Sequence, residues 1–110
     1  MSRIFKYSLQ IKHREIVQMP ASARIISVVW QNGLPFLYAV VEDEGRIKPR
    51  IIRTVTTGEI FNEEGCRFIG TLQGGSPQWF VAHVFEQYAG SNDPVSDRFA
   101  NDFRAIGKEI

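Results

Sequence analysis

The sequence is poor in the residue types that build redox and metal centres. It contains one cysteine, Cys66, and two histidines, His13 and His83. A single cysteine can form neither a disulfide within the chain nor a cluster of thiolate metal ligands. The histidines do not stand at the helical spacing of metal-binding pairs, and the acidic residues gather in loops, so we predict no metal and no cofactor.

Long apolar runs and a charge of one sign are also missing. No stretch approaches the ~18 apolar residues that a membrane span needs. The opening "MSRIFKYSLQIKH" lacks the apolar region of a signal peptide. The 13 basic and 12 acidic residues nearly cancel, which does not favour a nucleic-acid or membrane-surface partner. We therefore expect a cytoplasmic protein.

Apolar and β-branched residues, by contrast, are abundant. Hydrophobic residues make up 44% of the 110 positions, enough for one domain with its own core. Alternating or β-branched runs bounded by turn residues predict seven strands, at residues 4–11, 16–19, 24–31, 34–42, 50–58, 66–72 and 79–87. The predicted fold class is mainly β (α+β), an antiparallel sheet in a sandwich or barrel-like form, within a core domain of residues 1–90.

A hairpin is predicted at "VVWQNGLPFLYAVVE", residues 28–42. Asn32-Gly33 suits a type I′ turn, which needs positive φ at both central positions. Pro35 has no amide hydrogen, so that end of the returning strand should lie at an edge or beyond its pairing. Both runs are apolar on both faces, and we expect another sheet, a helix or a second subunit to cover each face. This predicts a homo-oligomer, a dimer or larger.

The hydrophobic period changes near the C-terminus. Asp93 is suited to cap a helix, and Pro94 to its first position. The apolar residues that follow recur at helical spacing and form one stripe: Val95, Phe99, Phe103, Ile106 and Ile110. We expect one C-terminal helix in residues 91–110, packed on the core or on a partner chain.

Arginine makes up most of the basic residues, and its guanidinium binds phosphate and carboxylate groups well. The candidate ligand-binding residues are Arg50, Arg53, Thr56, Thr57, Arg98 and Arg104. Arg50 and Arg53 are separated by an odd number of positions, so on one strand they point to opposite faces and cannot hold the same anion. The two helical arginines also diverge. The alternative for all of them is ordinary solvated surface.

Catalytic residues are not evident. A Cys66–His83 pair could form a nucleophile and base if the last two strands were neighbours. The reading that we favour is a buried thiol and a histidine satisfied within the core. We therefore do not predict an enzyme.

Several segments together resemble an uncharacterised domain family found in small phage and prophage proteins. These segments are "RIFKYSLQI", "VQMPASARIISVVWQNGLPFLYAVVE", "VTTGEI", "FIGTLQGG" and "VAHVFE", and they span residues 3–86. Glu59 stands where many members have histidine, and Ala82 where they often have tryptophan. The family has no established activity, so the resemblance implies no catalytic residue.

The resemblance implies a phage or prophage accessory protein acting in the bacterial cytoplasm. The first functional hypothesis is a non-enzymatic oligomer that sequesters a nucleotide-like signal and so blunts host defence, by analogy with phage sponge proteins. The second is a protein-binding accessory factor that inhibits a host protein or assembles with phage components. An enzyme is the third.

Overall fold

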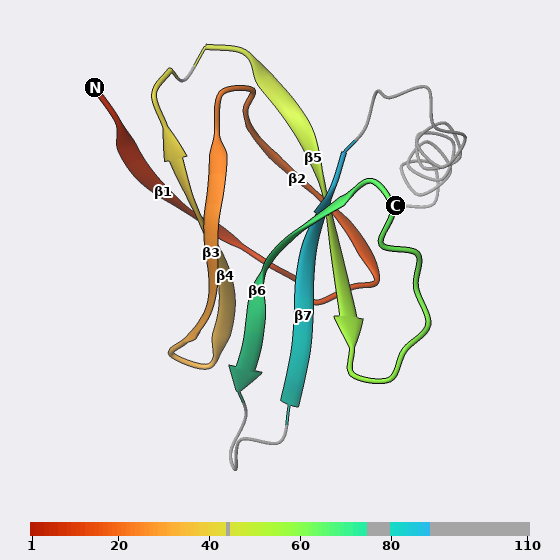
Figure 1. Ribbon diagram of the computed structural model, residues 1–110. Coiled ribbons are helices and arrows are strands. Elements are labelled where there is room, and N and C mark those ends of the chain that lie inside the picture. Colours follow the sequence, from red (N-terminus) through yellow and green to blue (C-terminus); the bar gives the residue numbers. More distant parts are fainter. Residues whose placement is uncertain (44, 75–79, 89–110) are drawn as a thin grey trace, which may run out of the picture.

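The computed structural model describes residues 1–43, 45–74 and 80–88 (Figure 1). The seven strands in these residues are β1 (Arg3–Ser8), β2 (Arg14–Pro20), β3 (Arg24–Gln31), β4 (Leu34–Val41), β5 (Ile47–Thr56), β6 (Cys66–Gly74) and β7 (Phe80–Gln87). The C-terminal helix and domain predicted at residues 91–110 lie outside the described residues. The described part of the chain contains no helix long and apolar enough to cross a membrane.

The strands form two antiparallel sheets (Figure 1). One has three strands in the order β1-β4-β3, and the other has four in the order β2-β5-β7-β6. The sandwich that the sequence predicts is therefore confirmed. The barrel-like alternative is wrong, because β3 and β6 pack together without a hydrogen-bonded ladder to close the sheets.

The core lies between the two sheets. Every second residue of each central strand points into it, as strand geometry requires. The fully enclosed side chains include Leu37, Ala39 and Val41 of β4, Ile52 of β5, Leu72 of β6 and Val84 of β7. Burying a side chain the size of valine or leucine contributes about 1.5–3 kcal/mol, so this layer supplies the main driving force for folding.

The Asn-Gly hairpin forms between β3 and β4. Asn32 and Gly33 have φ values of 52° and 79°, and Gln31 pairs with Leu34, as in a type I′ turn. The carbonyl of Pro35 accepts the N–H of Leu9 at 3.1 Å, after β1 has ended. Pro35 therefore lies beyond the β1 ladder, which ends at Phe36, as predicted for one side of the strand, but it still pairs with Trp30 of β3.

Only one face of this hairpin is covered within the described residues. On the other face, Phe36, Tyr38 and Val40 form a half-buried column along β4. The ammonium of Lys6 lies 4.4 Å from the centre of the Phe36 ring, and Tyr38 Oη donates to Gln31 Oε1 at 2.7 Å. Side chains of the neighbouring strands, such as Lys6 and Gln31, partly shield this column from solvent, and no second sheet or helix covers it within the described residues. The homo-oligomer inferred from double covering stays a prediction.

The first strand is shorter than predicted. It ends at Ser8 instead of residue 11, and Ile11 adopts a φ of 57°, which is uncommon for a β-branched residue. The carboxylate of Glu15 accepts the N–H groups of Gln10 and Lys12 at 2.9 and 3.3 Å. These bonds stabilise a turn where the apolar alternation alone predicts continued strand.

Candidate ligand-binding site

The outer face of the four-stranded sheet gathers charged, aromatic and hydroxyl side chains. The residues that alternate with the core positions of β5 and β7 point to this face. Strand pairing aligns them in two rows, Arg14–Arg53–Phe85–Phe68 and Val55–His83–Thr71. Cations, phenyl rings and an imidazole thus share one surface.

Arg53 is a partly buried positive charge on this face. Its Nε donates to the carbonyl of His13 at 3.0 Å, and an Nη donates to Gln87 Oε1 at 3.3 Å. Burial, and then the neighbouring charge of Arg14, lower the pKa of the Arg53 guanidinium. The nearby carboxylate of Glu59 raises that pKa as a smaller cause, and a further anion would stabilise the charged guanidinium more. The geometry therefore suits a negatively charged ligand.

A tight turn after β5 forms the rim of the face. The N–H of Glu59 donates to the carbonyl of Thr56 at 3.1 Å, and Glu59 Oε1 accepts the backbone N–H and hydroxyl of Thr56 at 3.0 and 3.1 Å. The other carboxylate oxygen lies 2.7 Å from His13 Nδ1. The backbone hydrogen bond from Thr56 is the largest cause of a lowered pKa for Glu59. The turn is thus held by a carboxylate that stays charged.

His83 is fixed by two threonines. Its Nε2 lies 2.9 Å from Thr57 Oγ1, and its Nδ1 lies 3.1 Å from Thr71 Oγ1. A neutral imidazole has one donor and one acceptor nitrogen, and hydroxyl groups can serve both. The ring is therefore oriented by β6 and by the turn after β5.

An apolar patch adjoins these polar groups. It consists of Ile60, Phe61, Phe68 and Phe85. The ring of Phe85 lies 4.9 Å from that of Phe61 and 5.3 Å from that of Phe68, measured between centroids. Ile60 and Phe68 are 97% and 54% exposed. Aromatic surface is thus available beside Arg53, the combination that a stacked, anionic ligand requires.

Three of the six predicted ligand-binding residues, Arg53, Thr56 and Thr57, lie on this face or at its rim, with Thr57 bonded to His83 at the end away from Arg53. Arg50 lies on the opposite face of β5, as its odd spacing from Arg53 predicts. Arg98 and Arg104 lie outside the described residues.

The side chain of Arg50 is buried and makes contacts that stabilise the fold. Its Nε lies 2.5 Å from Glu86 Oε2, and an Nη donates to the carbonyl of Ala23 at 2.7 Å. Arg67 donates to the carbonyl of Ile25 at 3.0 Å and lies 3.5 Å from Glu86 Oε1. Because the Arg50 and Glu86 side chains are only 12% and 4% exposed, these contacts tie the two sheets together inside the protein.

The Cys66–His83 pair does not form. Cys66 pairs with Gln87, whereas His83 pairs with Thr71, four residues further along the sheet or about 13 Å. Burial also raises the pKa of the Cys66 thiol, which disfavours the nucleophilic thiolate. Among the described residues, no three His, Cys, Asp or Glu side chains gather in a metal-binding cluster.

Sequence reasoning did not find the parts played by Arg14, His13, Glu59 and His83. Alternation along β7 placed His83 and Phe85 on one face correctly. Which strands flank β7, and in what register, depends on contacts distant in sequence, and no local pattern specifies them. The Thr-Gly turn was the one local signal near Glu59.

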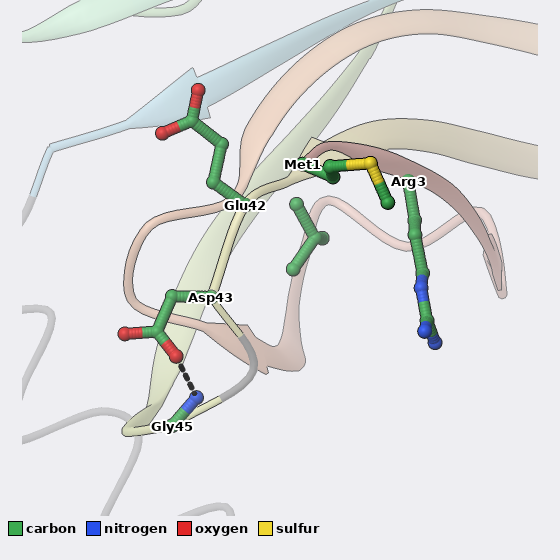
Figure 2. A pocket seen from close by; sticks show the side chains of 6 residues that line it. Met1, Arg3, Glu42, Asp43 and Gly45 are labelled. Atoms are coloured by element: carbon green, nitrogen blue, oxygen red, sulfur yellow. Dashed lines mark hydrogen bonds between the residues drawn. The ribbon is translucent and has the colours of Figure 1, made fainter.

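A shallow pocket of about 560 Å³ lies elsewhere, beside the start of β1. Figure 2 shows its side chains diverging, with the carboxylates of Glu42 and Asp43 directed away from the guanidinium of Arg3. Asp43 Oδ1 accepts the N–H of Gly45 at 3.0 Å. These groups do not converge on a common ligand position, so the outer face of the four-stranded sheet is the stronger candidate.

Comparison with known proteins agrees with the uncharacterised family that the sequence resembles. No curated protein and no solved structure matches the chain. A domain of unknown function, DUF7352, matches residues 1–94, which include all seven strands. The chain therefore belongs to the DUF7352 family.

Proposed function

We propose that this protein is a non-enzymatic binding protein of phage or prophage origin that acts in the bacterial cytoplasm. Its ligand is a small, nucleotide-like anion, and sequestering that ligand blunts a host defence signal. The phage context rests on the family resemblance. The ligand class rests on the outer face of the four-stranded sheet.

The observation that carries this proposal is the setting of Arg53. Its guanidinium is partly buried beside Arg14 and directly across the strand pair from Phe85. A phosphate would neutralise the paired cations, and a base would stack on the exposed ring of Phe68. Thr57 and His83, which hydrogen-bond to each other at the far end of the same face, would offer the ligand further polar groups.

Binding is tested by thermal denaturation of the full chain with cyclic dinucleotides, cyclic trinucleotides and ADP-ribose. A ligand at about 100 times its Kd stabilises the folded state by about 2.7 kcal/mol, which a melting curve resolves. Arg53→Met should then weaken binding by roughly 10- to 100-fold, the value of a charged hydrogen bond. Arg24→Gln, on the exposed side of the other sheet, is the matched control. The absence of a shift with all three classes contradicts the proposal.

A protein partner is the second candidate, because Ile60 and Phe68 leave a substantial part of the apolar patch in solvent. Exposed apolar surface of this kind is typical of interaction sites. Retention of one bacterial protein by the wild type, and its loss with Phe68→Ser while Arg53→Met retains it, would favour an accessory factor over a nucleotide sponge.

Self-association is proposed through the outer face of the three-stranded sheet. Its apolar column of Phe36, Tyr38 and Val40 continues to Ile4, which is 63% exposed. Sedimentation of the full chain at micromolar concentration should give at least a dimer, and Tyr38→Lys should give a monomer. A monomeric wild type contradicts this proposal.

A further inference from the structure

We infer that the free edge of β2 binds an extended segment of a partner protein as an added strand, and that this segment carries a carboxylate opposite Arg14. β2 is the last strand of the four-stranded sheet, so within the described residues no strand pairs with its outer edge. Such an edge can pair with a strand of another chain through main-chain hydrogen bonds. The contact is made by the backbone of β2, so it does not depend on a nucleotide ligand.

The register of β2 against β5 determines which backbone groups face the edge. In an antiparallel pair, residues that lie opposite each other are alternately hydrogen-bonded and non-hydrogen-bonded. The N–H of Thr54 donates to the carbonyl of His13 at 3.4 Å, and the N–H of Ala21 donates to the carbonyl of Arg46 at 2.7 Å. These two pairs lie at the two ends of the ladder and continue its register. The odd-numbered residues of β2 therefore bond to β5.

The even-numbered residues Ile16 and Gln18 consequently direct their N–H and C=O groups away from β5. The position of Pro49 agrees with this assignment, because it lies opposite Gln18, where β5 needs no donor toward β2. Gln18 is exposed and Ile16 is half-buried. Each of these two residues thus offers one donor and one acceptor to an incoming strand at the centre of β2.

The edges of β3 and β6 are closed to such a strand. Val28 and Trp30 of β3 pack so tightly on Gly70 and Gly74 of β6 that a Cβ at either glycine would crowd them. Each of the two strands also carries a register shift in its ladder. Irregularities of this kind disrupt the pairing of an edge with another chain.

The edge of β1 is protected by a charge. The N–H of Leu9 donates to the carbonyl of Pro35 in the register of the β1–β4 ladder, so the even-numbered residues of β1 face its edge. Lys6 lies at the centre of that edge, with its ammonium 4.4 Å from the centre of the Phe36 ring. A lysine on an edge strand disfavours pairing with another chain. Among the described edges, β2 is the one that has a regular ladder and no lysine.

The side chains of β2 specify the chemistry of the added strand. A residue opposite Arg14 would extend the row Arg14–Arg53 on the outer face of the sheet. Burial, and then the charge of Arg14, lower the pKa of the Arg53 guanidinium, so a carboxylate at the end of this row would be stabilised. Two positions along, the added strand would meet Ile16, which favours a β-branched side chain. The segment should therefore carry an acidic and a branched apolar residue two positions apart.

The test is a nuclear magnetic resonance titration of the isotope-labelled full chain with two synthetic peptides. The first carries threonine, valine and glutamate at alternate positions with valine between them, and the second has lysine in place of glutamate. When the glutamate peptide saturates the protein, the amides of Ile16 and Gln18 should exchange with solvent about tenfold more slowly. The amides of Ile4 and Lys6, on the edge of β1, should change little. The lysine peptide should bind about three- to tenfold more weakly.

A proline variant tests the main-chain contact. Gln18→Pro removes a donor from the edge without removing a bond to β5, and it should weaken binding of the glutamate peptide by about three- to tenfold. Ser8→Pro makes the same change at an edge-facing position of β1 and is the matched control, which should bind like the wild type. If circular dichroism shows that Gln18→Pro does not fold, Gln18→Lys gives the edge of β2 the charge that protects β1 and should weaken binding in the same way.

Equal changes at the edges of β1 and β2, or no change at either with both peptides at millimolar concentration, would overturn the inference. Protection of the Ile16 and Gln18 amides that rises with protein concentration in the absence of peptide would also overturn it, in favour of a second copy as occupant. If no nucleotide shifts the melting temperature, the proposed function fails, while the peptide titration still decides whether the edge of β2 binds a strand.

Discussion

Arg50 of β5 and Glu86 of β7, on neighbouring strands of the four-stranded sheet, form an ion pair 2.5 Å apart, with both side chains almost fully buried. Arg50 also donates to the carbonyl of Ala23, and Arg67 approaches the second carboxylate oxygen at 3.5 Å. A buried carboxylate depends on such partners, because removing one leaves an uncompensated charge in a medium of low polarity.

Arg50→Met should therefore lower the free energy of unfolding by about 3–5 kcal/mol, measured by urea denaturation. The double variant Arg50→Met/Glu86→Leu removes both charges and should recover most of the loss. If the single variant is as stable as the wild type, the buried ion pair does not stabilise the fold.

Gly74 and Trp30 provide a second test of the packing between the sheets. A Cβ at position 74 would lie closer to the indole ring of Trp30 than packed atoms allow. Gly74→Ala should cost about 1–3 kcal/mol of stability, the usual effect of overpacking, in chemical denaturation. In Gly45→Ala the nearest described atoms to the new Cβ belong to the side chain of Asp43, from 3.3 Å, so this control should change little. Equal effects of the two variants would contradict the close packing.

Glu59 gives the protein a predictable response to acid. Because the folded-state pKa of Glu59 is lowered, chiefly by the backbone hydrogen bond from Thr56, the charged carboxylate favours the folded state. This contribution is present above the ordinary glutamate pKa of about 4.3 and is lost as the pH falls through the lower folded value.

Glu59→Gln should accordingly lose less stability than the wild type between pH 5 and pH 2.5, on denaturation curves recorded at each pH. Glu64→Gln, exposed in the same loop, is the control and should follow the wild type. Parallel curves for all three proteins would show that the Thr56–Glu59 turn does not bind the carboxylate as described.

Cys66 should be a slow nucleophile. Burial raises the pKa of its thiol, so less thiolate is present at neutral pH than in an exposed cysteine. Alkylation by iodoacetamide at pH 7 should be slower in the folded protein than in urea, where the thiol is free of the fold. Faster reaction in the folded state would point to an activated cysteine and would revive the enzymatic alternative.

Local chemistry predicted much of this architecture. The Asn32-Gly33 turn, the seven strands and the two faces of β7 all follow from short-range patterns, because φ preferences and side-chain alternation act within a few residues. The end of β1 was missed because Glu15, which lies beyond the apolar run, supplies the hydrogen bonds of the turn.

The candidate site was predicted only in part, for a physical reason. Alternation separates Arg50 from Arg53, yet it cannot say which of them meets a buried carboxylate. That choice depends on the pairing of β5 with β7, which brings Glu86 beside Arg50 and Gln87 beside Arg53 across more than thirty positions. Interactions at that distance are decided by the global fold.

The arginines between the sheets also bear on solubility. β3 is an edge strand, and an exposed edge offers unpaired carbonyls to strands of other molecules. The carbonyls of Ala23 and Ile25 already accept guanidinium groups from the neighbouring sheet. These two carbonyls of the edge are thus already hydrogen-bonded within the molecule and are not available to a strand of another molecule. Arg50 and Arg67 therefore also disfavour aggregation through the edge of β3.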